Sequence, residues 1–126
     1  MRLLTFKIGS AFMALTVDSV ISVELSKKRD GLKSTAGLMV ELDRILGLTS
    51  GKAQNQAVIK CRHQEKLFDL LADEVLGLED VDPSRHLAWP GVLAFMKNYT
   101  GVVMMSGKAF LTLDLGSVLT VLKNER

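Results

Sequence analysis

The sequence predicts an all-β fold in which short strands close into a small barrel. Three observations support this prediction. Apolar residues alternate with other residues in several segments, turn residues recur about every 8–12 positions, and only short stretches show helical spacing. We count roughly seven to nine candidate strands, a number typical of all-β barrels.

The composition is that of one folded unit. A chain of 126 residues has room for one compact domain or two small subdomains that share a core. Hydrophobic residues make up 48% and charged residues 24%, which excludes a disordered tail. The formal charge of +2 is too small by itself to indicate a nucleic-acid or membrane partner. No apolar run reaches the ~20 residues of a membrane span and no leader pattern opens the chain, so we expect a cytoplasmic protein.

The first expected element is an N-terminal hairpin. Alternation over residues 3–8 predicts a strand, and Gly9-Ser10 supplies a tight turn into a second strand over residues 11–16. From Val17 the apolar spacing changes to three and four, which predicts a short helical turn capped by Thr16 or Asp18. Alternation returns at residues 21, 23 and 25 and predicts another strand.

The next thirty residues are less regular. Residues 26–37 are polar, with two glycines and four basic side chains, and are expected to form an exposed loop. The basic side chains either keep that loop solvated or contact an anion or a partner. Residues 38–48 have helical apolar spacing that ends at Gly47, although the first of them fit a strand equally well. Residues 49–56 contain no large apolar side chain and are the expected connection between two subdomains.

The central segment, residues 57–81, predicts a second hairpin. Its strands are Ala57–Cys61 and Leu67–Val75, and the polar residues 62–65 connect them. A helix is the alternative for the second of these, because its apolar residues also fall at helical spacing. The β-branched pair before the connection and Gly77 after it favour strands.

The C-terminal third predicts a helical turn, a third hairpin and a final helix. Pro83 follows Asp82, a pattern that favours a single helical turn, and residues 89–91 form a second breaker. Residues 102–105 and 109–115 fit a hairpin around Ser106-Gly107. Residues 116–122 fit a short helix, with Lys123 and Arg126 near its negative end.

A search for catalytic and metal-binding patterns finds little. The phosphate-binding glycine loop, the nucleophile elbow and the metalloprotease helix motif are all missing. Cys61, His63 and His86 lack the repeated spacing of a metal site, so we interpret Cys61 as a buried or edge cysteine. A single cysteine also agrees with a reducing compartment. Nothing near the carboxylates Asp69, Asp73 and Glu74 supplies a nucleophile, so we expect them to face solvent or stabilise turns. The sequence therefore predicts no enzyme, no catalytic residue, no cofactor and no metal, but a module that acts through its surface.

Several segments, in order, resemble the CheW-like domain, the chemotaxis adaptor that couples receptors to the histidine kinase CheA. The residues that carry this resemblance are Leu4–Gly9 with Ala14–Glu24, then Leu70–Leu78, and finally Tyr99–Val102 with Phe110–Leu115. The resemblance implies one domain over residues 1–126, made of two intertwined five-stranded SH3-like barrels. It also implies a non-enzymatic adaptor whose partners are a CheA-like histidine kinase regulatory domain and the cytoplasmic tip of a chemoreceptor.

The same resemblance suggests which residues bind a partner. The family's receptor-contact motif, N-L-R-G, is replaced here by the basic loop, in which Arg29-Asp30-Gly31 is the nearest counterpart. Val20 matches an apolar position of the family's receptor groove, so we expect it to be exposed there, and Ser22 replaces the usual acidic neighbour. The predicted partner-binding residues are Val20, Ser22, Val23, Glu24, Arg29, Gly31, Gly77 and Leu78.

The alternative function is binding of nucleic acid by a small β-barrel. Lys27, Lys28, Arg29 and Lys33 would then contact phosphates. This alternative requires a basic stripe beyond the one loop, and it predicts binding that weakens steeply with salt. The aromatic residues are spaced as core residues and are not clustered with lysine and arginine as in a base-stacking platform.

Overall fold

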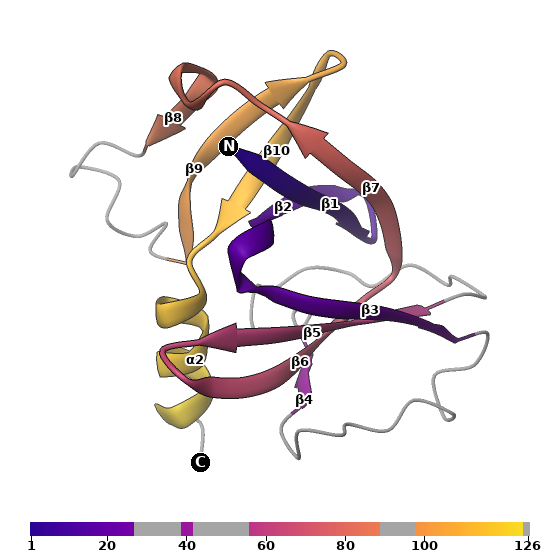
Figure 1. Cartoon of the computed structure of the whole chain (residues 1–126), viewed down its shortest axis with the longest axis vertical. Helices are drawn as coiled ribbons and strands as arrows, with labels where there is room; N and C mark the ends of the chain where they lie inside the picture. The colour runs from indigo at the N-terminus through magenta and orange to yellow at the C-terminus, as the bar shows by residue number, and fades with distance from the viewer. Residues whose placement is uncertain (27–38, 42–55, 89–97, 125–126) are drawn as a thin grey trace.

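The structure, a computed structural model, describes residues 1–26, 39–41, 56–88 and 98–124. Strands dominate these residues, so the predicted all-β class is confirmed (Figure 1). The elements are β1 (Arg2–Ile8), β2 (Ala11–Thr16), η1 (Val17–Ser19), β3 (Val20–Ser26), β4 (Met39–Glu41), β5 (Gln56–His63), β6 (Lys66–Ala72), β7 (Glu74–Asp80), η3 (Pro83–Arg85), β8 (His86–Ala88), β9 (Tyr99–Met105), β10 (Lys108–Leu113) and α2 (Leu115–Asn124).

The strands form two sheets that exchange segments of the chain. The large sheet has the order β7-β1-β2-β10-β9-β8, and the small sheet has the order β3-β5-β6-β4. The chain leaves the large sheet after β2, passes through η1 into β3, and returns from β6 to β7 across a single residue, Asp73. Figure 1 shows β7 running from the small sheet up to the large one. The two sheets are therefore intertwined rather than consecutive along the chain.

The central hairpin is built from strands, and the helix alternative is wrong. β5 and β6 pair from Ala57–Ala72 to His63–Lys66, so the connection contains only Gln64 and Glu65. Both of these residues have positive φ, 50° and 67°, as a two-residue hairpin turn requires. The expected second strand is also too long, because pairing with β5 ends at Ala72 and the chain changes sheet after it.

The shorter predicted elements are largely confirmed. The turn η3 begins as expected, with Ser84 N donating to Asp82 Oδ1 at 2.9 Å. The turn η1 also forms, but Thr16 at its N-cap makes no side-chain capping bond. Where the start of the segment 38–48 fitted helix or strand equally well, the structure has the strand β4. β9 begins three residues earlier than predicted. The helix α2 extends beyond the predicted helix at both ends.

Other expectations concern residues that the structure does not describe. They are the basic loop beyond residue 26, the helix after residue 41, the subdomain connection over residues 49–55, the breaker at residues 89–91, and Arg126. Gln56, the last residue of the expected connection, instead begins β5.

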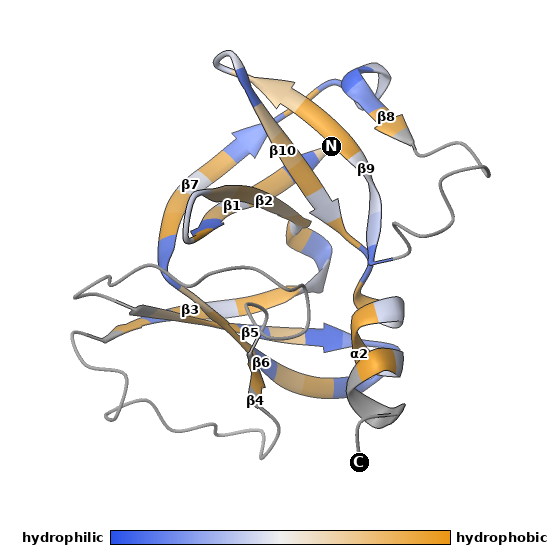
Figure 2. Cartoon of the chain, turned by 180° about the vertical axis from the view of Figure 1, so that it is seen from behind, coloured by the Kyte–Doolittle hydropathy of each residue, from blue (hydrophilic) through white to orange (hydrophobic). Residues whose placement is uncertain are grey.

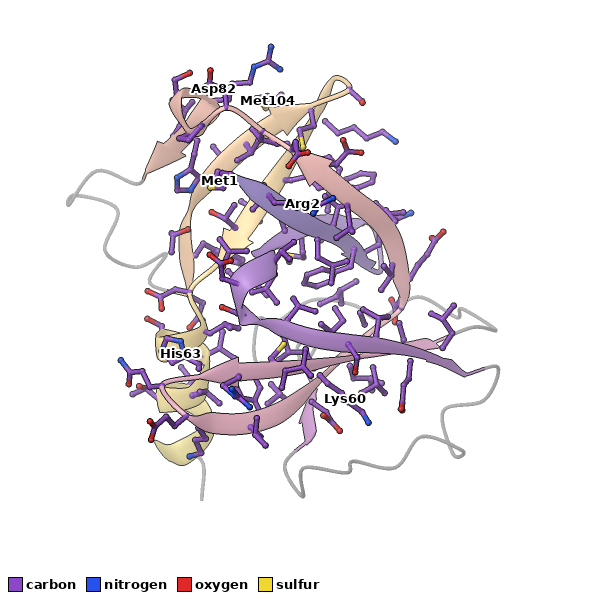
Figure 3. All side chains as sticks on the ribbon, in the orientation of Figure 1. Met1, Arg2, Lys60, His63, Asp82 and Met104 are labelled. Atoms are coloured by element: carbon purple, nitrogen blue, oxygen red, sulfur yellow. The ribbon has the colours of Figure 1, made fainter. Side chains whose placement is uncertain are left out.

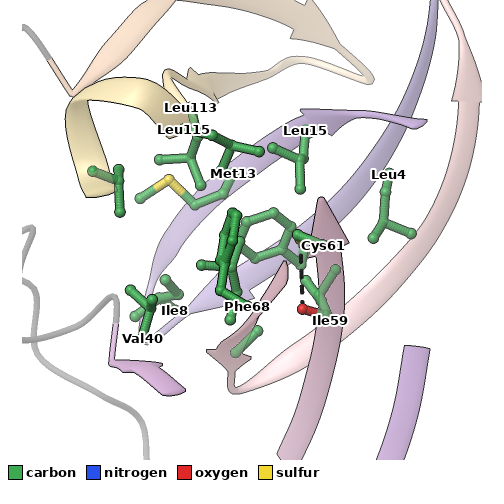
Figure 4. Packing of buried hydrophobic residues seen from close by; sticks show 14 residues of the cluster. Leu4, Ile8, Met13, Leu15, Val40, Ile59, Cys61, Phe68, Leu113 and Leu115 are labelled. Atoms are coloured by element: carbon green, nitrogen blue, oxygen red, sulfur yellow. Dashed lines mark hydrogen bonds between the residues drawn. The ribbon is translucent and has the colours of Figure 1, made fainter. Parts of the chain in front are cut away.

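The core consists of two clusters on opposite faces of the large sheet. The main cluster lies between the two sheets, with α2 at one end (Figure 4), and its largest fully buried side chains are Phe6 and Phe68. The second cluster uses the alternate positions of the same strands, such as Leu3 and Ala14 of β1 and β2, and packs them against Phe110. Period-two alternation thus places side chains of one strand in two cores. Among the described residues, no helix is long and apolar enough to cross a membrane.

Two buried side chains bear on the sequence expectations. Cys61 lies in the main cluster, and its burial raises the pKa of the thiol to about 12, with the nearby Asp69 contributing in the same direction. Asp69 and Asp73 are both buried, so the expectation that these carboxylates face solvent is wrong. Asp73 does stabilise a turn, because its Oδ2 accepts a hydrogen bond from the backbone amide of Gly9.

Candidate functional site

The strand β3 forms one edge of the small sheet. It pairs with β5 on one side, and the described strands leave its other side open. Two large apolar side chains of β3 are exposed, Ile21 by 54% and Leu25 by 75%. An edge strand with exposed apolar residues is a ready template for contact with another chain.

A bulge at the start of β3 decides which side chains face the core. Val20 pairs with Cys61 and Ser22 with Lys60, so Ile21 is the extra residue. Beyond the bulge, Val23 pairs with Ile59 and Leu25 pairs with Ala57. Because Cys61, Ile59 and Ala57 are buried on one face of β5, the three β3 residues opposite them point to that same face. These residues are Val20, Val23 and Leu25.

Burial along this face of β3 is greater at Val20 and Val23 than at Leu25 near the end of the strand. Val20 and Val23 are half-buried and pack against the main core cluster. Val20 is therefore less exposed than we expected of a groove residue. The reason is the bulge, which holds this side chain over Cys61 while the extra residue, Ile21, is exposed. Leu25 continues the same face but lies beyond the core, where most of its surface is accessible.

The strand β7 forms the corresponding edge of the large sheet. It pairs only with β1 among the described strands, and a bulge opposite Thr5 leaves Leu76 as the extra residue. Gly77 has a φ of +155°, and Thr5 Oγ1 donates to its carbonyl at 3.1 Å. Figure 2 shows that β7 is apolar in its middle and hydrophilic at both ends.

The core-facing side of β7 also ends in an exposed leucine. Val75 pairs with Phe6 and Leu78 pairs with Leu4, and both partners belong to the main core cluster. Val75 is half-buried against that cluster, whereas Leu78 is 55% exposed. The two edge strands therefore border the same core from different sheets. We call Val20, Val23 and Leu25 of β3, together with Val75 and Leu78 of β7, the intersheet rim.

The outer face of β3 has a different character. Ser22 and Glu24 point away from the intersheet rim, and Glu24 Oε1 lies 3.0 Å from Lys60 Nζ (Figure 3). Because Glu24 is more than half exposed, this ion pair is worth little in stability. A partner that binds the intersheet rim would not contact the carboxylate of Glu24, because that side chain points to the opposite face of β3.

The structure thus divides the predicted partner-binding residues into three groups. Val20, Val23 and Leu78 belong to the rim, Ser22 and Glu24 lie on the outer face, and Gly77 lies in the bulge of β7. Arg29 and Gly31 lie outside the described residues. Sequence reasoning missed Leu25 and Val75. Their alternation was visible, but the bulges that select which residues face the core were not.

A small cavity lies beside the start of β3. Its volume is about 220 Å³, and it is lined by leucines of β1, β2, β10 and α2, by Thr16 and Ser19 around η1, and by His63 and His86. The hydroxyls of Thr100 and Thr112 lie 2.7 Å apart, and His86 Nε2 lies 2.9 Å from Thr112 Oγ1. These side-chain contacts join β8, β9 and β10, and Thr112, which takes part in both, is buried.

The weak metal pattern noted in the sequence is not assembled as a ligand set. Cys61 lies in the main core, where its thiol contacts the carbonyl of Ile59 at 3.5 Å, while His63 and His86 line the cavity. Within the described ranges, no group of three histidine, cysteine or acidic side chains has the geometry to hold a metal ion.

Comparison with known proteins identifies the architecture. No protein-family model and no curated protein sequence matches the chain. Among solved structures, the scaffolding protein TtCheW from Thermoanaerobacter tengcongensis is similar over 90% of this chain and 84% of that chain, with a TM-score of 0.74 and 16% sequence identity. At this identity the likeness shows the fold alone, which is the fold implied by the sequence resemblance.

Proposed function

Because the chain has a CheW-like fold, we propose that it is a non-enzymatic adaptor of chemotaxis-type signal transduction. Its partners in this proposal are the regulatory domain of a CheA-like histidine kinase and the cytoplasmic tip of a chemoreceptor. Residues 1–126 act as one domain in the cytoplasm, with the two sheets as its subdomains. The similar solved structure is described as a scaffolding protein, which supports a role in assembling other proteins.

The intersheet rim is the observation that carries this proposal. It combines half-buried valines, which fix the backbone, with two exposed leucines from different sheets. A few apolar anchors at the centre of an interface supply most of its binding energy. The edges of β3 and β7 that the described strands leave unpaired offer backbone groups for pairing. A protein partner therefore fits this surface better than nucleic acid, which would require a basic stripe.

The proposal is tested by measuring binding of the purified chain to a kinase regulatory domain and to a receptor-tip fragment. L25E and L78E each place a charge on the rim, so each should weaken binding of a rim partner by about tenfold or more. L67E is the matched control, because Leu67 is also exposed but lies at the far end of β6, next to the hairpin turn.

Each outcome decides between alternatives. Binding of the kinase fragment at low and moderate salt, lost in L25E or L78E and kept in L67E, supports the adaptor. Equal effects of the three variants would reject the rim as the binding surface. Binding of nucleic acid alone, lost as salt rises, would favour the alternative function.

A further inference from the structure

A second cavity lies on the face of the large sheet that points away from the small sheet. Its volume is about 370 Å³, and it is bordered by β1, β2, β7 and the β9–β10 hairpin. Figure 1 shows the β9–β10 hairpin and the end of β7 in the upper part of the molecule, away from α2. Six of its lining residues carry the argument: Lys7, Phe12, Glu74, Glu79, Lys108 and Phe110.

The floor of this cavity is aromatic and fixed. The rings of Phe12 and Phe110 lie 5.2 Å apart between centroids and are tilted by 57°. Phe110 belongs to the second core cluster and is buried, and Phe12 packs against that cluster while remaining partly accessible. An apolar group that binds in the cavity would therefore contact a preformed surface. Binding would not cost the entropy of ordering these two side chains.

The ammonium groups of Lys7 and Lys108 lie beside the ring of Phe12. Lys7 Nζ lies 5.3 Å and Lys108 Nζ lies 4.7 Å from the centroid of the Phe12 ring. Neither group forms an ion pair with a carboxylate in the part of the chain that the structure describes. The ring attracts both cations, which come from the two strands that flank β2, and the exposed ammonium group of Lys108 can bind a carboxylate.

The β7 side of the cavity is acidic, and its Glu74 is the cross-strand neighbour of Lys7. Glu74 and Glu79 both lie on β7, both are exposed, and neither forms an ion pair with a described residue. A ligand that carried only a negative charge would be repelled by this wall, and a ligand that carried only a positive charge would be repelled by the lysines. A small molecule with both charges and an apolar body satisfies all three features of the cavity.

We propose that this cavity binds a free α-amino acid with an apolar or aromatic side chain. The carboxylate lies against Lys108, the ammonium group faces Glu79, and the side chain packs on Phe12 and Phe110. The site lies on the other face of the large sheet from the intersheet rim, so it does not depend on the adaptor function.

The test is a titration of the isotopically labelled chain with L-phenylalanine, followed by NMR. We expect saturable shifts of the amides around Phe12 and Lys108, with a dissociation constant of about 1 mM, since the cavity is open to solvent. N-acetyl-L-phenylalanine lacks the ammonium group and phenethylamine lacks the carboxylate, so each should bind about tenfold more weakly.

Variants test the two walls separately. K108Q and E79Q each remove one exposed charge, and each should weaken L-phenylalanine about tenfold. K66Q removes an exposed lysine of β6 outside this cavity and should leave binding unchanged. No saturable shift with L-phenylalanine, equal binding of the three probes, or an equal effect of K66Q would each overturn the proposal. Unchanged denaturation midpoints of the variants confirm that the fold is intact.

Discussion

The backbone amide of Gly9 donates a 2.5 Å hydrogen bond to Oδ2 of Asp73. Gly9 has a φ of +60° in the β1–β2 turn, and Asp73 is the single residue between β6 and β7. The amide of Asp73 also donates to the carbonyl of Lys7 at 3.0 Å. One buried aspartate therefore fixes both the first hairpin and the point where the chain changes sheet.

Replacement of Asp73 by alanine should lower the free energy of unfolding by about 1–3 kcal/mol, because the partly buried amide of Gly9 loses its partner. Guanidinium denaturation measures the change. D80A is the control: Asp80 is exposed and its contact with Arg2 is 3.8 Å long, so its effect should be about 0.5 kcal/mol or less. Equal losses in the two variants would contradict the role of Asp73.

The neighbouring leucines of β6 provide a second test. Leu70 is fully buried in the main core, whereas Leu71 lies on the other face of the sheet and is only half-buried. L70A should therefore reduce stability by about 2–5 kcal/mol, and L71A should reduce it clearly less. The same denaturation experiment measures both, and a larger effect of L71A would reverse the assigned facing of β6.

Gly101 permits the close approach of β8 to β9. A Cβ atom at this position would overlap the carbonyl of Leu87 and lie 2.8 Å from His86 Nε2. G101A should therefore displace β8 and speed hydrogen exchange of the amides of β8. Gly116 is a milder case, since its Cβ would lie 3.3 Å from His63 Nε2. Unchanged exchange in β8 of G101A would show that the strand pairing tolerates the methyl group.

The sequence was sufficient for the elements whose signals are local. Gly9-Ser10 and Ser106-Gly107 predict tight turns whatever lies around them, and Asp82 before Pro83 predicts the start of η3. The central hairpin required a choice between helix and strand, which its β-branched residues and Gly77 decided correctly. Its exact turn was not predictable, since Gln64 and Glu65 are unusual residues at positive φ.

The features that the sequence did not predict depend on contacts between distant residues. The bulges at Ile21 and Leu76 arise from pairing with β5 and β1, and they decide which side chains border the core. Asp69 and Asp73 were expected to face solvent or stabilise turns; Asp73 does stabilise a turn, yet sheet packing buries both. The sequence thus predicted the strands and, through the family resemblance, Val20, Val23 and Leu78 of the rim, but not Leu25 and Val75.

The buried thiol of Cys61 gives a prediction about pH. Its pKa of about 12 in the folded chain is above its usual value of 9.0, because burial disfavours the thiolate. Below pH 9 the thiol is neutral in both states and its contribution is fully present. As pH rises from about 9 to 12, the unfolded state ionises first and stability decreases. C61A should remove this part of the alkaline loss in a series of denaturation curves.

Reaction with a thiol reagent gives an independent measurement of the same burial. Labelling of the folded chain at pH 8 should be slow and should accelerate with denaturant as the chain unfolds. Rapid labelling without denaturant would contradict the position of Cys61 in the main core.

Charges placed along the core-facing side of β3 should separate stability from binding. Val20 is half-buried against the main core, so V20E should reduce the free energy of unfolding by about 1–3 kcal/mol. Leu25 is on the same face but 75% exposed, so L25E should leave stability nearly unchanged while it weakens a partner that uses the rim. Measuring unfolding and partner affinity for both variants separates the two effects. If L25E were as destabilising as V20E, Leu25 would be a core residue and the rim would lose its exposed anchor on β3.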